Sequence, residues 1–270
     1  MRPDLPKRVY GAILAVLPAA LLIGLGGWWL LAVMPFLIWG LAREWTHLTL
    51  PQADVRDHLV HAAAPVVALV PFAWAWWGGR EFDLAMFAIC IALVLLLDVV
   101  ISRVSGISRA RMPFLVLGTV YITLPVLAFL WLRDGDGGLG RVIWLVLVVI
   151  ATDSFAYFAG SSIGGAKLAP KISPGKTWSG LLGGCAGAAF VGAVLASFVG
   201  FHALPAAMLG VFIALVSQAG DLFESWLKRR AGVKDSGNLI PGHGGLLDRL
   251  DGYMFALPVM ALIVASGGVS

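Results

Sequence analysis

The chain has 270 residues, of which 60% are hydrophobic and only 13% are charged, and its formal net charge at pH 7 is +4. This composition excludes an ordinary soluble domain, which would expose far more charge. Nothing indicates nucleic acid as a partner, because the basic residues lie in short loops and not along one extended face. Cys90 and Cys185 lie in apolar runs without metal-ligand spacing, so we expect them to pack inside the membrane.

Apolar segments of about the length that crosses a bilayer as a helix follow one another along the chain. We therefore expect an all-α, polytopic integral membrane protein with about nine transmembrane helices. The expected spans are approximately 9–24, 26–42, 58–77, 83–101, 113–132, 142–160, 178–200, 205–226 and 252–267. The first resembles a signal peptide, but eight further spans follow, so we interpret it as uncleaved. About four spans fall in residues 1–112 and about five in residues 113–270, and we expect them to form one membrane domain.

The distribution of lysine and arginine predicts the orientation. With the N-terminus in the cytoplasm, only Arg80, Arg133 and Arg141 of the 19 basic residues fall on the far side. Basic residues are enriched in cytoplasmic loops. We therefore expect a multi-pass protein of the cell's inner (plasma) membrane, with its N-terminus in the cytoplasm and its C-terminus outside.

Six acidic residues lie inside or at the ends of the expected spans, all toward the cytoplasmic side. They are Asp98, Asp153, Asp221, Glu224, Asp248 and Asp251. An acid at the centre of a membrane helix costs about 2.5–3.5 kcal/mol on insertion scales, so such groups usually face a polar cavity and have a role. The alternative is that some reach the interface, which we favour for Asp98 but not for Asp153 or Asp221. The acids predict a site that opens to the cytoplasm.

Residues 217–251 form the densest run of charge. Two acidic pairs, each spaced for one helical face, flank a basic cluster and a glycine-rich loop. In chain order these are Asp221 and Glu224, Lys228 to Arg230, Pro241 to Gly245, and Asp248 and Asp251. Carboxylates that can hold a cation, beside basic groups and accessible backbone amides, predict a polyphosphate site. The basic cluster could instead anchor the helix to anionic lipid, most of all through Arg230. For His243, in the loop, a substrate contact and a structural role both stay open.

A second polar stretch covers residues 152–180. Asp153 opens it, three lysines follow, and residues 173–177 are expected to form a turn into the next helix, with Thr177 or Ser179 as its cap. Lysines beside helix N-terminal amides favour phosphate. Residues 175–177 look like the end of a P-loop, but position 170 is proline and no strand is expected before it, so we exclude that motif.

At these two stretches the chain resembles the phosphatidate cytidylyltransferases, also called CDP-diacylglycerol synthases. The matching residues are Asp153, Ala156, Tyr157, Gly160, Ile172 to Pro174, Lys176 to Trp178, Gln218, Gly220, Asp221, Ser225, Lys228, Arg229, Lys234, Asp235, Ile240 to Gly245, Asp248, Arg249 and Asp251. The resemblance covers roughly residues 115–260. The chain departs from the family at Ser179, where a glutamate is usual.

The resemblance implies a membrane enzyme, commonly a homodimer, that joins CTP and phosphatidic acid to give CDP-diacylglycerol and pyrophosphate. It also implies Mg²⁺ held by Asp221 and Asp248, with room for a second cation. We expect Asp153 and Asp251 to assist the metal, and Lys228 and Arg229 to act in catalysis with Asp221 and Asp248. The other expected substrate contacts are Lys167, Ser173, Lys176, Thr177, Lys234, Asp235, His243, Gly244, Gly245 and Arg249.

Two alternatives stay open. A CTP-dependent lipid-alcohol kinase would release CDP instead of pyrophosphate, and it would need a base to deprotonate its alcohol. A polytopic transporter coupled to protons or cations would explain the intramembrane acids. It would not explain the basic cluster and the glycine loop gathered on one face.

Overall fold

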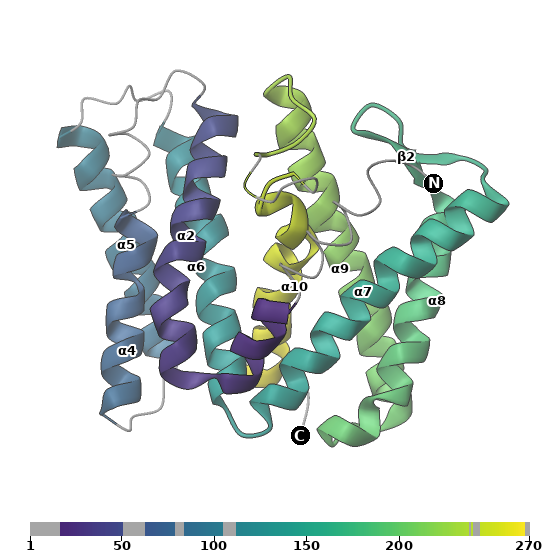
Figure 1. The fold of residues 1–270 in the computed structure, drawn as a ribbon, viewed down its shortest axis with the longest axis horizontal. Coiled ribbons are helices and arrows are strands. Elements are labelled where there is room, and N and C mark those ends of the chain that lie inside the picture. The colour runs from purple at the N-terminus through teal and green to yellow at the C-terminus, as the bar shows by residue number, and fades with distance from the viewer. Residues whose placement is uncertain are drawn as a thin grey trace. The chain divides into compact units, whose positions relative to one another are not determined.

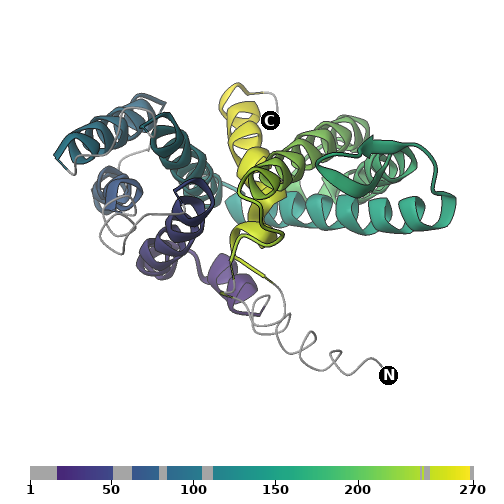
Figure 2. The same ribbon diagram turned by 90° about the horizontal axis from the view of Figure 1, so that it is seen from above.

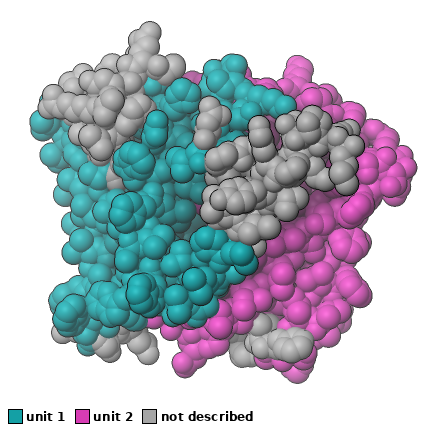
Figure 3. Space-filling model, in the orientation of Figure 1, with its two compact units in different colours: residues 1–131, 231–249 teal, residues 132–230, 250–270 magenta. Residues whose placement is uncertain are grey.

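The computed structural model describes residues 17–50, 63–78, 84–104, 112–237, 239 and 244–267. This part of the chain is mostly helical, with one pair of short strands (Figure 1). It divides into two compact units (Figure 3). Unit 1 comprises residues 1–131 and 231–249, and unit 2 comprises residues 132–230 and 250–270.

Unit 1 is a bundle of helices that run roughly parallel (Figures 1 and 2). Its helices are α2 (Gly27–Thr49), α4 (Leu69–Trp77), α5 (Leu84–Val104) and α6 (Met112–Asp134), the last of which continues into unit 2. The indole Nε1 of Trp45 donates to the carbonyl of Phe114 at 2.9 Å, so it ties α2 to α6. Gly118 makes room for this ring, since a Cβ there would lie 2.0 Å from the indole nitrogen. Helices α2 and α6 therefore pack with almost no space for substitution.

Unit 2 is built on three closely packed helices, which cover residues 138–163, 178–194 and 203–230. Its elements are α7 (Gly138–Ile163), β1 (Lys167–Ala169), β2 (Ser173–Thr177), α8 (Trp178–Val194), η1 (Ala196–Val199), α9 (Ala203–Arg230) and α10 (Leu247–Ala265), whose first turn belongs to unit 1. A Cβ on Gly184 would lie 2.9 Å from the Thr152 carbonyl oxygen of α7, and one on Gly210 would lie 2.5 Å from the Ala188 oxygen of α8. Small residues let backbones approach in this way where membrane helices pack.

Three of the described helices are long and apolar enough to cross a membrane, namely α6, α7 and α9. Shorter apolar helices cover Ala63–Trp77, Ala85–Ile101 and Trp178–Val194. These findings support a helical membrane protein. The count of nine spans and the direction of the termini stay predictions.

The strands β1 and β2 correct the expectation of an all-α chain. Residues 173–177, expected as a turn, form β2, which pairs antiparallel with β1. Gly164 and Gly165 have φ of 66° and 99°, a left-handed conformation that ends α7 and redirects the chain into the hairpin. Pro174 is compatible with β2 because a two-stranded sheet has only edge strands.

Helix α2 also differs from its expected span, 26–42, because it continues to Thr49. Its buried residues Leu30, Met34, Ile38, Leu41, Trp45 and Leu48 recur every three or four positions, so they form one apolar stripe. Trp45 and Leu48 continue this stripe beyond the expected end. The helix ends at Thr49, and its C-cap, Leu50, directly precedes a proline in the sequence. This extension places Glu44 inside a helix.

Candidate active site

Unit 2 gathers acidic side chains from three helices. Asp153 comes from α7, Asp221 from α9 and Asp251 from α10, and they lie close enough for each to feel the charge of the others. Gln218 donates its Nε2–H to Asp153 Oδ1 at 3.2 Å, so α9 also holds the α7 acid. The structure therefore brings together three of the four residues predicted to hold metal.

Two glycines explain why Asp221 and Asp251 meet. A Cβ on Gly220 would lie 2.5 Å from the carbonyl oxygen of Asp251, and one on Gly252 would lie 2.4 Å from Ser217 Oγ. Helices α9 and α10 therefore touch backbone to backbone directly beside both carboxylates. The Gly-Asp and Asp-Gly pairs of the sequence thus fix the helix crossing as well as supplying the acids.

The lysine on β2 offsets part of this negative charge. Lys176 Nζ lies 2.5 Å from Asp221 Oδ2, and both side chains are partly exposed. Because its ammonium group lies directly on the carboxylate, the hairpin presents a cation at the acidic cluster. The same lysine is well placed to meet an anionic ligand that approaches Asp221.

The basic cluster at the end of α9 is divided among several partners. Lys228 donates to Glu224 Oε2 at 2.8 Å, with Glu224 fully buried and Lys228 only 9% exposed. Arg229 donates its Nε–H to the carbonyl of Ile172 at 3.3 Å, which ties α9 to the hairpin turn. Arg230 stacks over the Trp226 ring at 5.7 Å from its centroid. The burial of Lys228 means that it is no simple surface anchor, whereas Arg229 and Arg230 are exposed.

The helix cap predicted at Thr177 or Ser179 is confirmed at the end of β2. Thr177 accepts the Gly180 N–H at 3.1 Å and so caps α8. Ser179, at the position where the family usually has glutamate, bonds to the Gly164 carbonyl and to Thr177 Oγ1. Lys167 is exposed and Ser173 half-buried on the two strands. The substrate contacts predicted for Lys167, Ser173 and Thr177 stay predictions.

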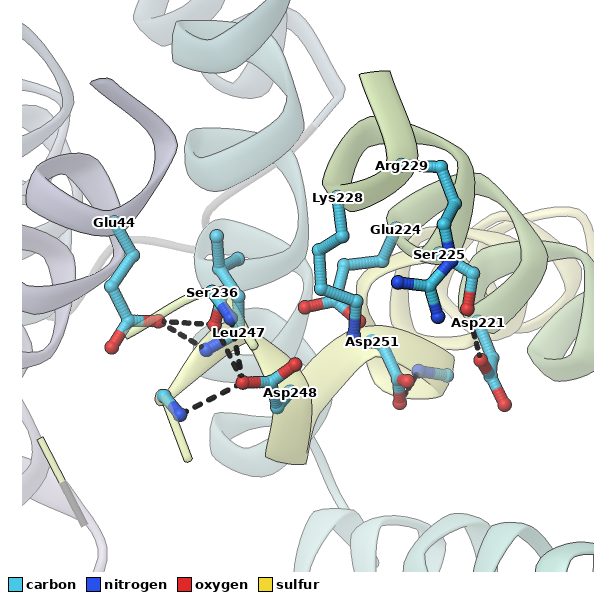
Figure 4. Close-up of polar contacts among 12 residues, drawn as sticks. Glu44, Asp221, Glu224, Ser225, Lys228, Arg229, Ser236, Leu247, Asp248 and Asp251 are labelled. Carbon is cyan, nitrogen blue, oxygen red and sulfur yellow. Dashed lines mark hydrogen bonds and ion pairs between the residues drawn. The ribbon is translucent and has the colours of Figure 1, made fainter. Parts of the chain in front are cut away.

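Unit 1 holds the other acid of the signature. Asp248 Oδ2 accepts hydrogen bonds from the Ser236 amide at 2.9 Å and the Gly245 amide at 2.8 Å, and it lies 2.9 Å from the Ser236 hydroxyl oxygen (Figure 4). Ser236 is completely buried. Of the remaining predicted contacts, Lys234, Asp235 and Arg249 are exposed, and Gly244 has a φ of 81°. His243 lies outside the described residues.

Glu44 belongs to the same cluster, and the sequence analysis missed it. Its side chain is 4% exposed. Its Oε1 accepts the Leu246 N–H at 2.8 Å, and its Oε2 accepts the Leu247 N–H at 2.8 Å and lies 3.0 Å from the Ser236 hydroxyl, which can donate its one proton to either Glu44 or Asp248 (Figure 4). The expected end of the second span at residue 42 had left it outside the intramembrane acids. One signal was available, because Glu44 is the only acid in the sequence between Asp4 and Asp54.

The acids of unit 2 suit a divalent cation in charge and in donor type. Within the described ranges, no three His, Cys, Asp or Glu side chains are arranged to hold a metal ion by themselves. Mg²⁺ rarely needs three, since it commonly takes one or two carboxylates together with waters and substrate phosphates. The ammonium group of Lys176 on Asp221 also shows that this carboxylate accepts a cation. Asp221 and Asp248 belong to different units, so a cation shared by the two stays a prediction.

A helical membrane fold with clustered acids and a lysine-bearing hairpin is typical of a membrane protein that handles anionic, phosphate-bearing ligands. The chain belongs to the Cytidylyltransferase family, whose model matches residues 6–266. This match confirms the resemblance seen in the sequence.

Several proteins named phosphatidate cytidylyltransferase are similar to this chain. The one from Brucella abortus is 46% identical over 152 residues, which cover 55% of this chain and 56% of that protein. The one from Rickettsia felis is 40% identical over 178 residues, covering 60% of this chain and 75% of that protein. The one from Bacillus subtilis is 36% identical over 192 residues, covering 70% of each. The chain thus spans little more than half the length of the Brucella relative.

Proposed function

We propose that this protein transfers the cytidylyl group of CTP to phosphatidic acid, which gives CDP-diacylglycerol and pyrophosphate for phospholipid biosynthesis. The observation that carries the proposal is the cluster of Asp153, Asp221 and Asp251 beside Lys176. It occurs in a chain that matches the Cytidylyltransferase family over nearly its whole length. The name of the relatives from Brucella, Rickettsia and Bacillus supports the same reaction.

The proposed chemistry is a direct displacement. A non-bridging oxygen of the lipid phosphate forms a new bond to the α-phosphorus of CTP, and the bond from that phosphorus to the β-phosphate oxygen breaks. Pyrophosphate leaves with the electron pair of that bond. A phosphate monoester has a second pKa of about 6, so the nucleophile is already anionic at neutral pH and needs no strong base. The protein must mainly bring two polyanions together and stabilise the charge that develops.

We propose Asp221 and Asp248 as the residues that hold Mg²⁺, with Asp153 and Asp251 assisting and a second cation as an option. When bound, Mg²⁺ would supply positive charge that offsets the charge of the phosphates.

The basic residues would act on the phosphates. Lys176 lies on Asp221 and is placed to pair with a phosphate oxygen brought to that carboxylate. Arg229 fastens the hairpin that carries Lys176, so it would position this lysine even if it does not touch the substrate itself. We assign the triphosphate and the lipid head group to these two residues together with Lys167, Lys228, Lys234 and Arg249.

The setting we propose is the inner (plasma) membrane, with nine spans, the N-terminus and the active site on the cytoplasmic side, and a homodimer as the working form. The placement of only Arg80, Arg133 and Arg141 on the far side supports this orientation. Nucleotides are available on the cytoplasmic side, which suits a site that uses CTP.

Product analysis tests the reaction. The purified protein, in detergent micelles containing phosphatidic acid, is supplied with CTP and Mg²⁺, and the products are separated. We expect pyrophosphate and CDP-diacylglycerol in equal amounts. CDP together with a phosphorylated lipid alcohol, when such an alcohol is supplied, would identify a lipid-alcohol kinase instead. Proton or cation flux in vesicles without any nucleotide product would identify a transporter.

A further inference from the structure

We propose that Glu44 is a positioning residue that holds the first turn of α10 and, through Ser236, sets the orientation of the Asp248 carboxylate. The inference rests on the proposed function, in which Asp248 binds the metal. It extends the site to α2, which lies outside residues 115–260, where the sequence resemblance was found.

The first step is the capping of α10. The first amides of a helix have no partner within it, and they are normally satisfied by a side chain close in sequence. Here the amides of Leu247, the first residue of α10, and of Leu246 just before it donate instead to the two oxygens of Glu44, both at 2.8 Å. A carboxylate is favourable at this end of a helix because of the helix dipole. Glu44 therefore fixes the start of the helix that carries Asp248.

The second step is the bridge through Ser236. Its hydroxyl oxygen lies 3.0 Å from Glu44 Oε2 and 2.9 Å from Asp248 Oδ2. Both carboxylates therefore lie within hydrogen-bonding distance of the same buried oxygen. Because a hydroxyl has one hydrogen, it donates to one of the two carboxylates at a time. The Ser236 amide also donates to Asp248 Oδ2. Any shift of Glu44 therefore moves the group that orients Asp248.

The third step is the tightness of the fit around Glu44. A Cβ on Gly245 would lie 2.1 Å from Ser236 Oγ and 2.5 Å from Glu44 Oε2, and one on Gly237 would lie 2.7 Å from Glu44 Oε1. The Gly245 amide is already engaged by Asp248 at 2.8 Å. Gly245 of the signature thus serves the Glu44 cluster by leaving room for its carboxylate.

The consequence for the reaction is a fixed orientation of the Asp248 carboxylate. A metal ligand displaced by about 1 Å can lower turnover by roughly 100-fold, even when nothing that touches the substrate has changed. Replacing Glu44 should therefore affect metal use and turnover more than nucleotide affinity, since its hydrogen bonds go to Ser236 and to the amides at the start of α10.

The test compares Glu44→Gln, Ser236→Ala and the control Thr49→Ala in the full chain. Thr49 lies on the same helix, and its hydroxyl donates within α2 to the Trp45 carbonyl at 2.8 Å. For Glu44→Gln we expect kcat to fall about 10- to 100-fold. The Mg²⁺ concentration for half-maximal rate should rise several-fold, while KM for CTP changes less than about twofold. Ser236→Ala should raise the Mg²⁺ requirement in the same direction, and Thr49→Ala should match the wild type.

Hydrogen exchange supplies a readout that needs no activity. In Glu44→Gln, the amides of Leu246 and Leu247 should exchange at least about tenfold faster than in the wild type, whereas Ser236→Ala should leave them protected. Unchanged exchange in Glu44→Gln would overturn the capping role. Faster exchange with unchanged kcat and Mg²⁺ dependence would overturn the positioning role. If the wild type forms no pyrophosphate, the proposed reaction fails, and the exchange result alone decides whether Glu44 holds the helix start.

Discussion

The buried ion pair of α9 gives the prediction whose size is easiest to derive from the structure. Glu224 is fully buried and Lys228 is 9% exposed, and their charged atoms lie 2.8 Å apart. Replacing Lys228 by methionine keeps the length of the side chain but leaves the Glu224 carboxylate buried without this cation. Removing one partner of a buried pair typically costs about 3–5 kcal/mol, far more than an exposed pair contributes.

The assay is thermal unfolding in detergent, measured beside the rate of pyrophosphate release. A loss of 3–5 kcal/mol corresponds to a fall in Tm of roughly 6–20 °C for a domain of this size. The double variant Lys228→Met/Glu224→Gln removes both charges, so we expect it to recover most of the lost stability. This matched pair separates the two roles of Lys228. A stable but inactive double variant would support the predicted catalytic role, whereas a stable and active one would leave Lys228 with a structural role only.

One outcome would refute the reasoning directly. If Lys228→Met alone unfolds within about 1 kcal/mol of the wild type, then the pair is not a buried interaction of the expected strength. The side chain of Lys228 would then have to be satisfied elsewhere in the working protein, and its burial on α9 could not be used to assign it a role.

The remaining predictions concern the metal, the hairpin and the helix crossing. Asp221→Asn and Asp248→Asn should each abolish CTP-dependent turnover, because an amide is a poor ligand for Mg²⁺. The fold should stay intact in gel filtration, since the amide introduced by Asp248→Asn can still accept hydrogen bonds through its carbonyl. Near wild-type rates would refute the metal assignment. Thr177→Ala should destabilise the protein by about 1 kcal/mol in thermal unfolding, because the α8 cap is lost, and Thr177→Ser should not. Gly184→Val should prevent stable folding, since even a Cβ would lie 2.9 Å from the Thr152 oxygen; a normal yield of folded protein would contradict the close α7–α8 packing.

The sequence predicted the helices well wherever apolar residues were continuous. The spans expected at 113–132 and 142–160 correspond to α6 and α7, because burial in a membrane requires a long apolar segment and little else. The hairpin was not predicted because its strands are short and polar. Its turn is held by Arg229, which lies 57 positions from its partner Ile172, and no local pattern reveals such a contact.

The candidate site was predicted in part for the same reason. Spacing on a helix face indicated the pairs Asp221 and Glu224, and Asp248 and Asp251. The structure places one acid of each pair, Asp221 and Asp251, near Asp153. The pairing of Glu224 with Lys228 could have been read from their separation of four residues on a helix. Glu44 could not be assigned to the site from sequence alone, because its partners lie about 200 positions away and depend on how α2 packs against the start of α10.

A structure determined with Mn²⁺ in place of Mg²⁺ and a non-hydrolysable CTP analogue would test the shared metal site most directly. The anomalous signal should place one Mn²⁺ in direct contact with a carboxylate oxygen from both Asp221 and Asp248, with the phosphates of the analogue completing its ligands. A metal bound to only one of these two residues, or two carboxylates too far apart to share an ion, would contradict the proposed site.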